Sequence, residues 1–165
     1  MLNVELHCHT NASKDSLIRP GDLLAACRRI GLDRVAITDH NTIAGALSAR
    51  DLDPELVIVG EEIKTSGGEL LAFFVEEEIP AGLPALETIA RLREQKAFIS
   101  VSHPFDQLRG GHWQLSELLA IAPYIDAIET FNARCLSPAF NHAAQEFAVR
   151  HRLPGTAGSD AHTIY

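Results

Sequence analysis

Short apolar segments typical of buried strands alternate along this 165-residue chain with amphipathic segments typical of helices. We predict strands at residues 2–9, 35–38, 56–59, 69–75, 98–101, 127–131 and 155–158. We predict helices at residues 20–30, 43–50, 84–95, 115–121 and 138–150. This alternation predicts an α/β fold in one domain, residues 1–165, with a mostly parallel sheet that is closed or nearly closed. The Ser66-Gly67-Gly68 turn is the exception, because it favours an antiparallel hairpin between the third and fourth strands.

The end of the chain leaves the predicted sheet without a final covering element. Tyr165 follows shortly after His162, and no segment remains to cover the last strand of a closed barrel. We therefore expect either a shortened version of the fold or a longer protein of which this is a part.

The composition excludes several classes of protein. No apolar run approaches the roughly 18 residues that span a bilayer, and no signal pattern opens the chain. Three scattered cysteines do not indicate a disulfide framework, which favours a reducing, cytoplasmic location. The formal charge of −8 argues against a nucleic-acid-binding face. This negative charge has two explanations: ordinary surface acidity, or carboxylates of a metal site whose charge the bound cations would neutralise.

Histidines follow several of the predicted strands directly, at the edge where α/β proteins build active sites. His7 and His9 share one face of the first strand, and Asp160 and His162 repeat that spacing at the last. His40 and His103 follow two further strands. Each signal alone has an ordinary structural explanation. Together they predict a metal centre, because imidazoles and carboxylates suit zinc, manganese or iron(II).

The motifs around these residues resemble the PHP (polymerase and histidinol phosphatase) domain family. They read His7-Cys8-His9-Thr10, Thr38-Asp39-His40, Ser102-His103-Pro104 and Ser159-Asp160-Ala161-His162. The similarity covers residues 4–163, and the four ordered motifs are highly specific as a set. The resemblance implies a distorted (β/α)7 TIM-like barrel, two to three divalent metal ions (manganese, zinc or iron) and phosphoesterase activity.

The resemblance also implies a set of ligands, divided among three cations. The first ion would bind His7, His9, Glu62 and Asp160, and another would bind Asp15, His40 and His162. Glu62 and His103 would hold the remaining ion, and with Asp160 they are the residues to which we assign catalysis. Many relatives have a histidine at the start of the fourth strand, where this chain has Glu69. Glu69 is therefore either an oxygen ligand that favours manganese, iron or magnesium, or a solvent-facing residue of the turn.

The sequence identifies substrate-binding residues less specifically than it identifies metal ligands. Arg134 stands at a strand end where its guanidinium would bind a phosphate, although a surface role explains it equally well. Lys64 lies near the ligands and would act as a point charge. For Glu129 a structural hydrogen bond is the better reading, and for Asp39 a supporting or capping role. We assign no general acid.

We expect a phosphoesterase that acts on a small phosphorylated metabolite or nucleotide, with no membrane or nucleic-acid partner. Two alternatives remain open, a non-catalytic metal-binding module and a hydrolase of C–N bonds like the amidohydrolases. A metal-binding module that has lost its catalytic activity usually loses metal ligands. Here every ligand position except that of Glu69 carries a residue that is an unambiguous metal ligand, which argues against such a module. The sequence does not determine the oligomeric state.

Overall fold

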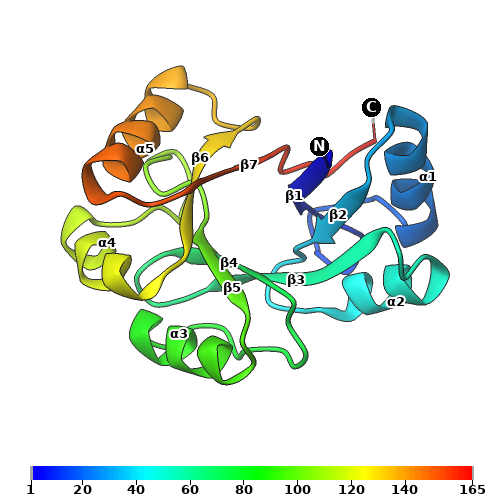
Figure 1. Cartoon of the computed structure of the whole chain (residues 1–165), viewed down its shortest axis with the longest axis horizontal. Coiled ribbons are helices and arrows are strands. Elements are labelled where there is room, and N and C mark those ends of the chain that lie inside the picture. Colours follow the sequence, from blue (N-terminus) through cyan, green and yellow to red (C-terminus); the bar gives the residue numbers. More distant parts are fainter. Residues whose placement is uncertain (1, 165) are drawn as a thin grey trace.

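The computed structural model describes residues 2–164 and contains one curled sheet of seven strands in the order β1 to β7 (Figure 1). The strands are β1 (Val4–Cys8), β2 (Arg34–Ile37), β3 (Val57–Lys64), β4 (Glu69–Phe73), β5 (Phe98–Val101), β6 (Ala127–Asn132) and β7 (Gly155–Gly158). Strand β4 is antiparallel to both of its neighbours, and the other neighbouring strands are parallel. The hairpin predicted at residues 66–68 is present.

The sheet curls until its first and last strands meet. Asp160 N donates a hydrogen bond to His7 O at 2.7 Å, and His9 N donates one to Ala161 O at 3.0 Å. These contacts lie just beyond β7, and among the described residues no continuous ladder joins β7 itself to β1. The protein is therefore a nearly closed seven-stranded barrel with one unsealed seam, as the predicted fold class requires.

The helices lie around the outside of the strands (Figure 1). They are α1 (Pro20–Ile30), α2 (Ala44–Leu52), α3 (Ala85–Glu94), α4 (Leu115–Ile121) and α5 (Pro138–His151), with a 3-10 turn, η1 (Ala122–Tyr124), after α4. Helix α1 begins with Pro20, which needs no amide partner, and ends at Gly31, whose φ of 79° lies in the left-handed region. None of the helices within residues 2–164 has the length and hydrophobicity needed to cross a bilayer.

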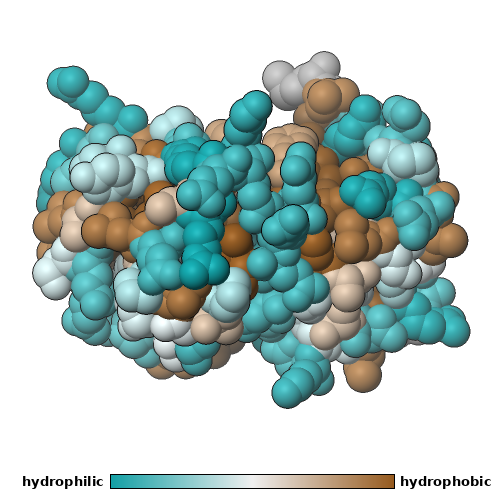
Figure 2. Space-filling view, turned by 90° about the horizontal axis from the view of Figure 1, so that it is seen from below, coloured by the Kyte–Doolittle hydropathy of each residue, from teal (hydrophilic) through white to brown (hydrophobic). Residues whose placement is uncertain are grey.

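Alternating strand residues divide the core into two parts. Val35 and Ile37 of β2 belong to the large cluster packed under the helices, whereas Ala36 between them joins Leu71 and Phe73 in a smaller cluster. This smaller cluster fills the barrel interior. On the face shown in Figure 2, apolar side chains lie in separate patches between polar ones, as on most protein surfaces.

Two local details depart from the simplest pattern of strand and helix. The pairing of β1 with β2 shifts register between Glu5 and Cys8, so Leu6 packs with the interior cluster while Cys8 lies in the outer one. A bulge therefore interrupts the alternation of side chains along β1. Helix α2 begins without a side-chain cap, and Asn41 just before it accepts from Lys64 N through Oδ1 at 2.8 Å.

Candidate metal centre

One edge of the barrel collects the predicted ligands. His7 and His9 lie at the end of β1, and His40 and His103 follow β2 and β5. Glu62 lies within β3, and Asp160 and His162 follow β7. Glu69 reaches the same edge from the opposite end of its strand, because β4 is antiparallel to its neighbours and begins where they finish.

Buried imidazoles and carboxylates converge at the centre of this edge without satisfying one another. His9 Nε2 lies 3.4 Å from Glu62 Oε2 and 3.3 Å from Asp160 Oδ1, and His7 Nε2 lies 3.3 Å from the same Glu62 oxygen. None of these residues is more than 1% exposed, and His7 Nε2, His9 Nε2 and Glu62 Oε2 have no hydrogen-bond partner. Unpaired buried polar atoms are unfavourable, and a shared cation satisfies all of them at once.

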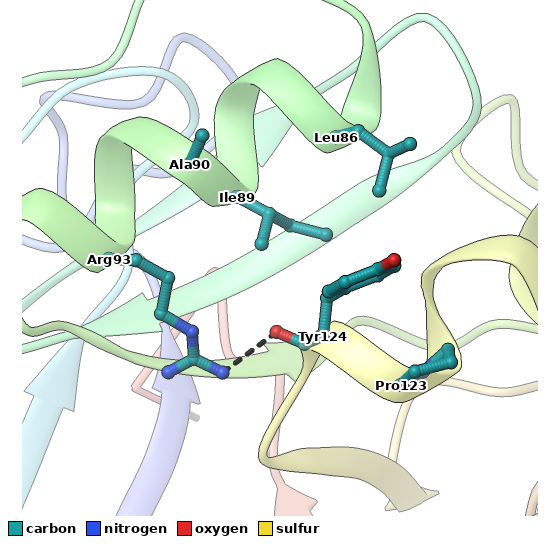
Figure 3. Close-up of a pocket in the computed structure, with 6 residues that line it drawn as sticks. All are labelled: Leu86, Ile89, Ala90, Arg93, Pro123 and Tyr124. Atoms are coloured by element: carbon teal, nitrogen blue, oxygen red, sulfur yellow. Dashed lines mark hydrogen bonds between the residues drawn. The ribbon is translucent and has the colours of Figure 1, made fainter.

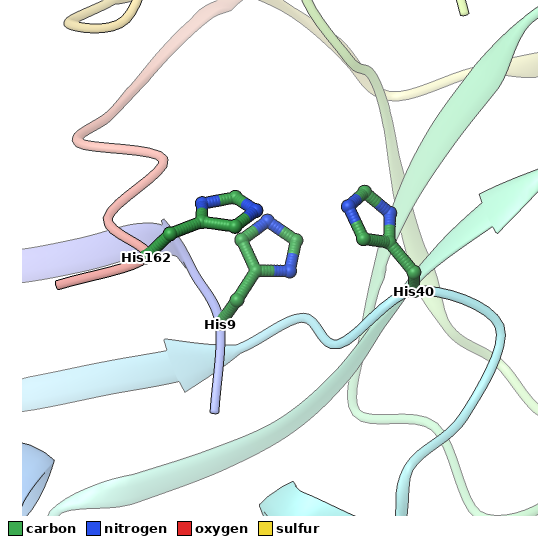
Figure 4. A group of neighbouring side chains, drawn as sticks. All are labelled: His9, His40 and His162. Atoms are coloured by element: carbon green, nitrogen blue, oxygen red, sulfur yellow. The ribbon is translucent and has the colours of Figure 1, made fainter. Parts of the chain in front are cut away.

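Three overlapping groups have ligand atoms within 4.8 Å of one another. They are His7, His9 and Asp160; His7, Glu62 and His103; and His9, His40 and His162. The third group is drawn in Figure 4, where the His9 ring lies between those of His40 and His162, with centroids at 4.4 and 4.2 Å. Asp15 Oδ2 lies 3.5 Å from His40 Nε2 and 3.2 Å from His162 Nε2. The structure thus brings together the ligands expected for each of the three positions.

Glu69 faces the site and not the solvent. Its Oε2 lies 3.6 Å from His103 Nε2, whose other close carboxylate oxygen is Glu62 Oε1 at 3.2 Å. The Glu69 side chain is 14% exposed. A Cβ at Gly111 would lie 1.8 Å from Glu69 Oε2, so glycine at this position leaves room for the carboxylate. Glu69 therefore occupies the position expected for an oxygen ligand.

A second layer of residues orients the ligands. Glu129 Oε1 lies 2.9 Å from His7 Nδ1, which leaves His7 Nε2 directed into the site, and Glu129 Oε2 accepts from His103 N at 2.8 Å. Asn132 Nδ2 donates to Glu129 and to Asp160, each at 3.1 Å. Asp39 accepts from both the amide and the hydroxyl of Thr10 at 2.6 Å. Glu129 and Asp39 therefore support the site, in keeping with their sequence interpretation.

The charges at the site favour ionised carboxylates. Burial raises the pKa of Glu62, but the imidazoles of His7 and His103 outweigh it and hold that pKa well below its ordinary value. Burial likewise raises the pKa of Asp160, and the His9 imidazole, whose Nε2 lies 3.3 Å from its Oδ1, leads the neighbouring groups that more than reverse the effect. Burial lowers the pKa of His40, but the Glu62 carboxylate, whose Oε2 lies 3.0 Å from His40 Nδ1, raises it to about 9 overall. The carboxylates of Glu62 and Asp160 are thus ionised and available to bind a cation.

A cavity of about 260 Å³ opens onto these ligands, and three basic residues line it. They are Lys64, Arg109 and Arg134. The sequence prediction included Lys64 and Arg134 but missed Arg109, which lies in the loop between β5 and α4. The only sequence signal there is Arg109-Gly110-Gly111, a glycine pair that allows close backbone approach soon after the Ser102-His103-Pro104 motif.

A larger cavity, of about 470 Å³, lies between α3 and η1 and is mainly apolar (Figure 3). Its lining includes Leu86, Ile89 and Tyr124. Its charged residue, Arg93, is already bound to Asp126 and to the carbonyl of Tyr124 at 2.7 and 2.8 Å. This cavity therefore lacks the convergent reactive groups that define the centre at the barrel edge.

The barrel and its histidine–carboxylate edge are typical of metal-dependent hydrolases. The PHP domain family matches residues 5–86, and a PHP-associated family matches residues 138–165. An uncharacterized protein of Methanocaldococcus jannaschii is 36% identical over 99% of this chain and 67% of its own length. The chain belongs to the PHP domain family.

Two further relatives extend the comparison. A 5'-3' exoribonuclease of Haemophilus influenzae is 32% identical over 56% of this chain and 36% of its own length. The solved structure of a Bifidobacterium adolescentis protein assigned as a metal-dependent phosphoesterase superposes with a TM-score of 0.78 at 20% identity. That superposition covers 98% of this chain and 88% of the other, which establishes a shared fold.

Proposed function

We propose that this protein is a metal-dependent phosphoesterase that hydrolyses the phosphate ester of a small metabolite or nucleotide. The observation that carries the proposal is the convergence of His7 Nε2, His9 Nε2 and Glu62 Oε2, which are buried and have no hydrogen-bond partner. A PHP-family chain that retains these atoms also retains the means to bind the catalytic ions of a hydrolase.

The residues divide into ligands and substrate-binding groups. His7, His9, Glu62 and Asp160 would hold one ion, Asp15, His40 and His162 a second, and Glu62, His103 and Glu69 a third. When bound, such ions lower the pKa of water and neutralise phosphoryl oxygens. Glu62 suits a bridging position because a carboxylate offers two oxygens and an imidazole offers one lone pair.

The basic side of the cavity would bind the substrate. Lys64 and Arg134 line the space beside the ligands, where they offer charge-assisted hydrogen bonds to a phosphate. Glu129 and Asn132 hold His7 and Asp160 in place while the ester is bound. Among the described residues at the centre, every carboxylate and imidazole has a ligand or supporting role, so we assign no side chain as general acid.

The metal proposal is tested by elemental analysis of protein purified without chelator. We expect two to three equivalents of manganese, zinc or iron per chain, bound within about 4 Å of one another. A content below one equivalent that does not rise on reconstitution would contradict the metal proposal. It would count equally against a metal-dependent hydrolase and against a non-catalytic metal-binding module.

The reaction class is tested with p-nitrophenyl phosphate and nucleoside monophosphates in the presence of each metal. Asp160→Asn keeps the shape of the side chain but removes its charge, so we expect a loss of activity of at least about 100-fold. Asp51→Asn, on the exposed surface of α2, is the matched control. Wild-type turnover by Asp160→Asn at saturating metal would show that Asp160 is not an essential ligand.

A second candidate function follows from the similarity to an exoribonuclease, namely hydrolysis at the end of a nucleic acid. The charge of −8 and the cavity of about 260 Å³ favour the small substrate. A 5'-phosphorylated oligonucleotide belongs in the same substrate panel, and its preferential hydrolysis would reverse this choice. An N-acyl amino acid tests C–N hydrolysis in parallel.

A further inference from the structure

A further cavity, of about 370 Å³, lies beside the cavity of the metal centre. Arg109 and Arg134 line both cavities, so the two spaces are neighbours and these side chains stand at their boundary. The cavity at the metal centre is otherwise lined by candidate ligands, a lysine and glycines. The neighbouring cavity differs, because Leu108, Ala133 and Leu136 form part of its wall. A polar space and a partly apolar space therefore lie side by side.

Two leucines on different loops line this partly apolar cavity. Leu108 is 67% exposed in the loop after β5, and Leu136 is 83% exposed in the loop after β6. A single exposed leucine is ordinary on a protein surface, whereas two that line one cavity offer a ligand an apolar surface to cover. Cys135 belongs to the same wall, and burial raises the pKa of its thiol to about 12, so the thiol stays neutral.

Buried polar residues hold both loops in place. Asp106 accepts from Leu108 N at 3.2 Å through Oδ1, and its Oδ2 lies 3.0 Å from Arg109 Nε. Asn132 accepts from Arg134 N at 2.9 Å through Oδ1. The cavity wall is therefore carried on ordered backbone, and a ligand would not have to order these loops when it binds.

The arginines at the boundary already have carboxylate partners. Arg109 contacts Asp106 and Asp160 through different nitrogens, and Arg134 Nη1 lies 3.3 Å from Asp160 Oδ1. A guanidinium whose N–H groups are paired with carboxylates still offers its planar face, which stacks on aromatic rings. Sugar hydroxyls would need hydrogen-bond partners, which leucines do not provide. Leucines and guanidinium planes together therefore suit a flat aromatic group better than a polyhydroxylated one.

We infer that the cavity of about 370 Å³ binds the organic part of the substrate, and that this part carries an aromatic ring close to the phosphate ester. This inference rests on the proposed function. With the phosphate at the metal centre, the alcohol portion of the ester extends past Arg109 and Arg134 into the neighbouring cavity. Leu108 and Leu136 determine the preference for a ring, because its burial removes apolar surface of both partners from water.

Binding of two phosphonates to the metal-loaded protein, measured by calorimetry, tests the inference without turnover. Phenylphosphonate and methylphosphonate share the anionic group and differ in the ring, so we expect the first to bind about 10–50-fold more tightly. In Leu108→Ser/Leu136→Ser this ratio should fall below about 3-fold at unchanged metal content. Ile30→Ser/Leu52→Ser, which changes two exposed residues of α1 and α2, is the control and should keep the wild-type ratio.

Cys135 reports whether the ring occupies this cavity. Cys8 and Cys27 are buried, whereas Cys135, which lines the cavity, is half-buried. A small methanethiosulfonate reagent should therefore modify Cys135 first. Bound phenylphosphonate should slow this modification and methylphosphonate should not, as measured by mass spectrometry of the peptides. Equal rates with the two phosphonates bound would place the ring elsewhere and overturn the inference.

Hydrolysis of benzyl phosphate and of ethyl phosphate provides an independent comparison, because both esters release a primary alcohol and differ in the ring. We expect Leu108→Ser/Leu136→Ser to lower kcat/KM about 10-fold for the benzyl ester and less than about 3-fold for the ethyl ester. Equal losses on both esters, or equal affinity of the wild type for the two phosphonates, would overturn the inference and leave the proposed function intact. If the wild type hydrolyses neither ester but prefers phenylphosphonate through the two leucines, the aromatic subsite stands and the proposed function fails.

Discussion

Glu69 is the residue at which this chain departs from the PHP pattern, and its carboxylate lies beside Glu62 and His103 instead of a further imidazole. Two carboxylates and one imidazole form a harder ligand set than one carboxylate and two imidazoles. Burial and the neighbouring charge of Glu62 raise the pKa of Glu69, so a cation there removes an unfavourable pairing of like charges.

Substitutions of Glu69 test whether its carboxylate binds a metal ion. Glu69→Gln should lose one metal equivalent and most of the activity, because an amide oxygen carries no charge for the ion. Glu69→His should recover the equivalent and shift the preference from manganese or iron toward zinc. Elemental analysis after reconstitution with each metal measures both effects, with the exposed Glu94→Gln as control. Full metal content in Glu69→Gln would remove Glu69 from the ligand set.

His40 provides a prediction for the chelated protein. Its pKa is raised to about 9, above the unfolded value near 6.5, so its contribution to stability is complete below pH 6.5. That contribution is lost as the pH rises through 9. We expect the free energy of unfolding in EDTA to fall by about 1–3 kcal/mol between pH 6.5 and 9.5.

Urea denaturation of His40→Gln and His142→Gln separates this effect from other titrations. His40→Gln should reduce the decline, although His7 and His103, whose pKa values are also raised, keep part of it. His142→Gln, whose side chain is 71% exposed on α5, should keep the whole decline. An unchanged decline in His40→Gln would assign the pH dependence to another group. Since metal ligands must be deprotonated, the same pKa implies that metal binding near pH 7 releases a proton from His40.

At the scale of elements, apolar runs and turn residues were sufficient to predict the seven strands and the five α-helices of residues 2–164, but not the 3-10 turn η1. Boundaries moved mainly where tertiary contacts extend an element. Strand β3 continues to Lys64, well beyond the apolar run at residues 56–59, because β4 pairs with it along Gly60–Lys64. Two charged residues, Glu61 and Glu62, therefore lie in a strand where local propensity does not place them.

The candidate site also contains residues whose positions were predictable from the sequence and residues whose positions were not. The convergence of the candidate ligands in strand-end motifs was predictable, since the position of a strand end follows from the local pattern. Arg109 was not, because its place depends on the path of a whole loop and on its pairing with Asp106. The orientation of Glu129 depends on a register shift in the β6–β7 pairing between Glu129 and Phe131, which the sequence does not encode locally.

Glu61 in β3 allows the candidate ligand Glu62 to be compared with its neighbour. Glu61 is fully buried on the outer face, where Oε2 accepts from Ile79 N at 3.2 Å and Oε1 has no partner. Burial raises the pKa of Glu61 to about 7. Its folded pKa therefore exceeds the unfolded value near 4.5, so stability is lost as the pH rises from 4.5 through 7.

Glu61→Gln should raise the free energy of unfolding at pH 8 by about 1 kcal/mol and leave metal content unchanged. Glu62→Gln should instead lose metal, because it removes the shared carboxylate. Denaturation at pH 5 and pH 8 measures the first effect, with the exposed Glu55→Gln as control. A gain at pH 5 as large as the gain at pH 8 would mean that ionisation of Glu61 is not its cause.

At the scale of the molecule, the proposed ions lie where the barrel is least connected. Among the candidate ligands, His7 belongs to the first strand and His9 follows it, and Asp160 and His162 follow the last strand. Near this edge the backbone joins the two ends through Asp160 N to His7 O and His9 N to Ala161 O. An ion bound by both ends would link the chain termini across the seam and complete the closure of the barrel.

This arrangement predicts that metal stabilises the seam more than the rest of the sheet. At 100 times the Kd, binding adds about 2.7 kcal/mol, which corresponds to a rise in Tm of roughly 5–10 °C for a domain of this size. Hydrogen exchange should slow most at the amides of His9 and Asp160, and much less in the continuous β4–β5 ladder. Asp160→Asn should abolish both effects. Uniform slowing across the sheet would indicate that the ions stabilise the fold globally and do not act as a link across the seam.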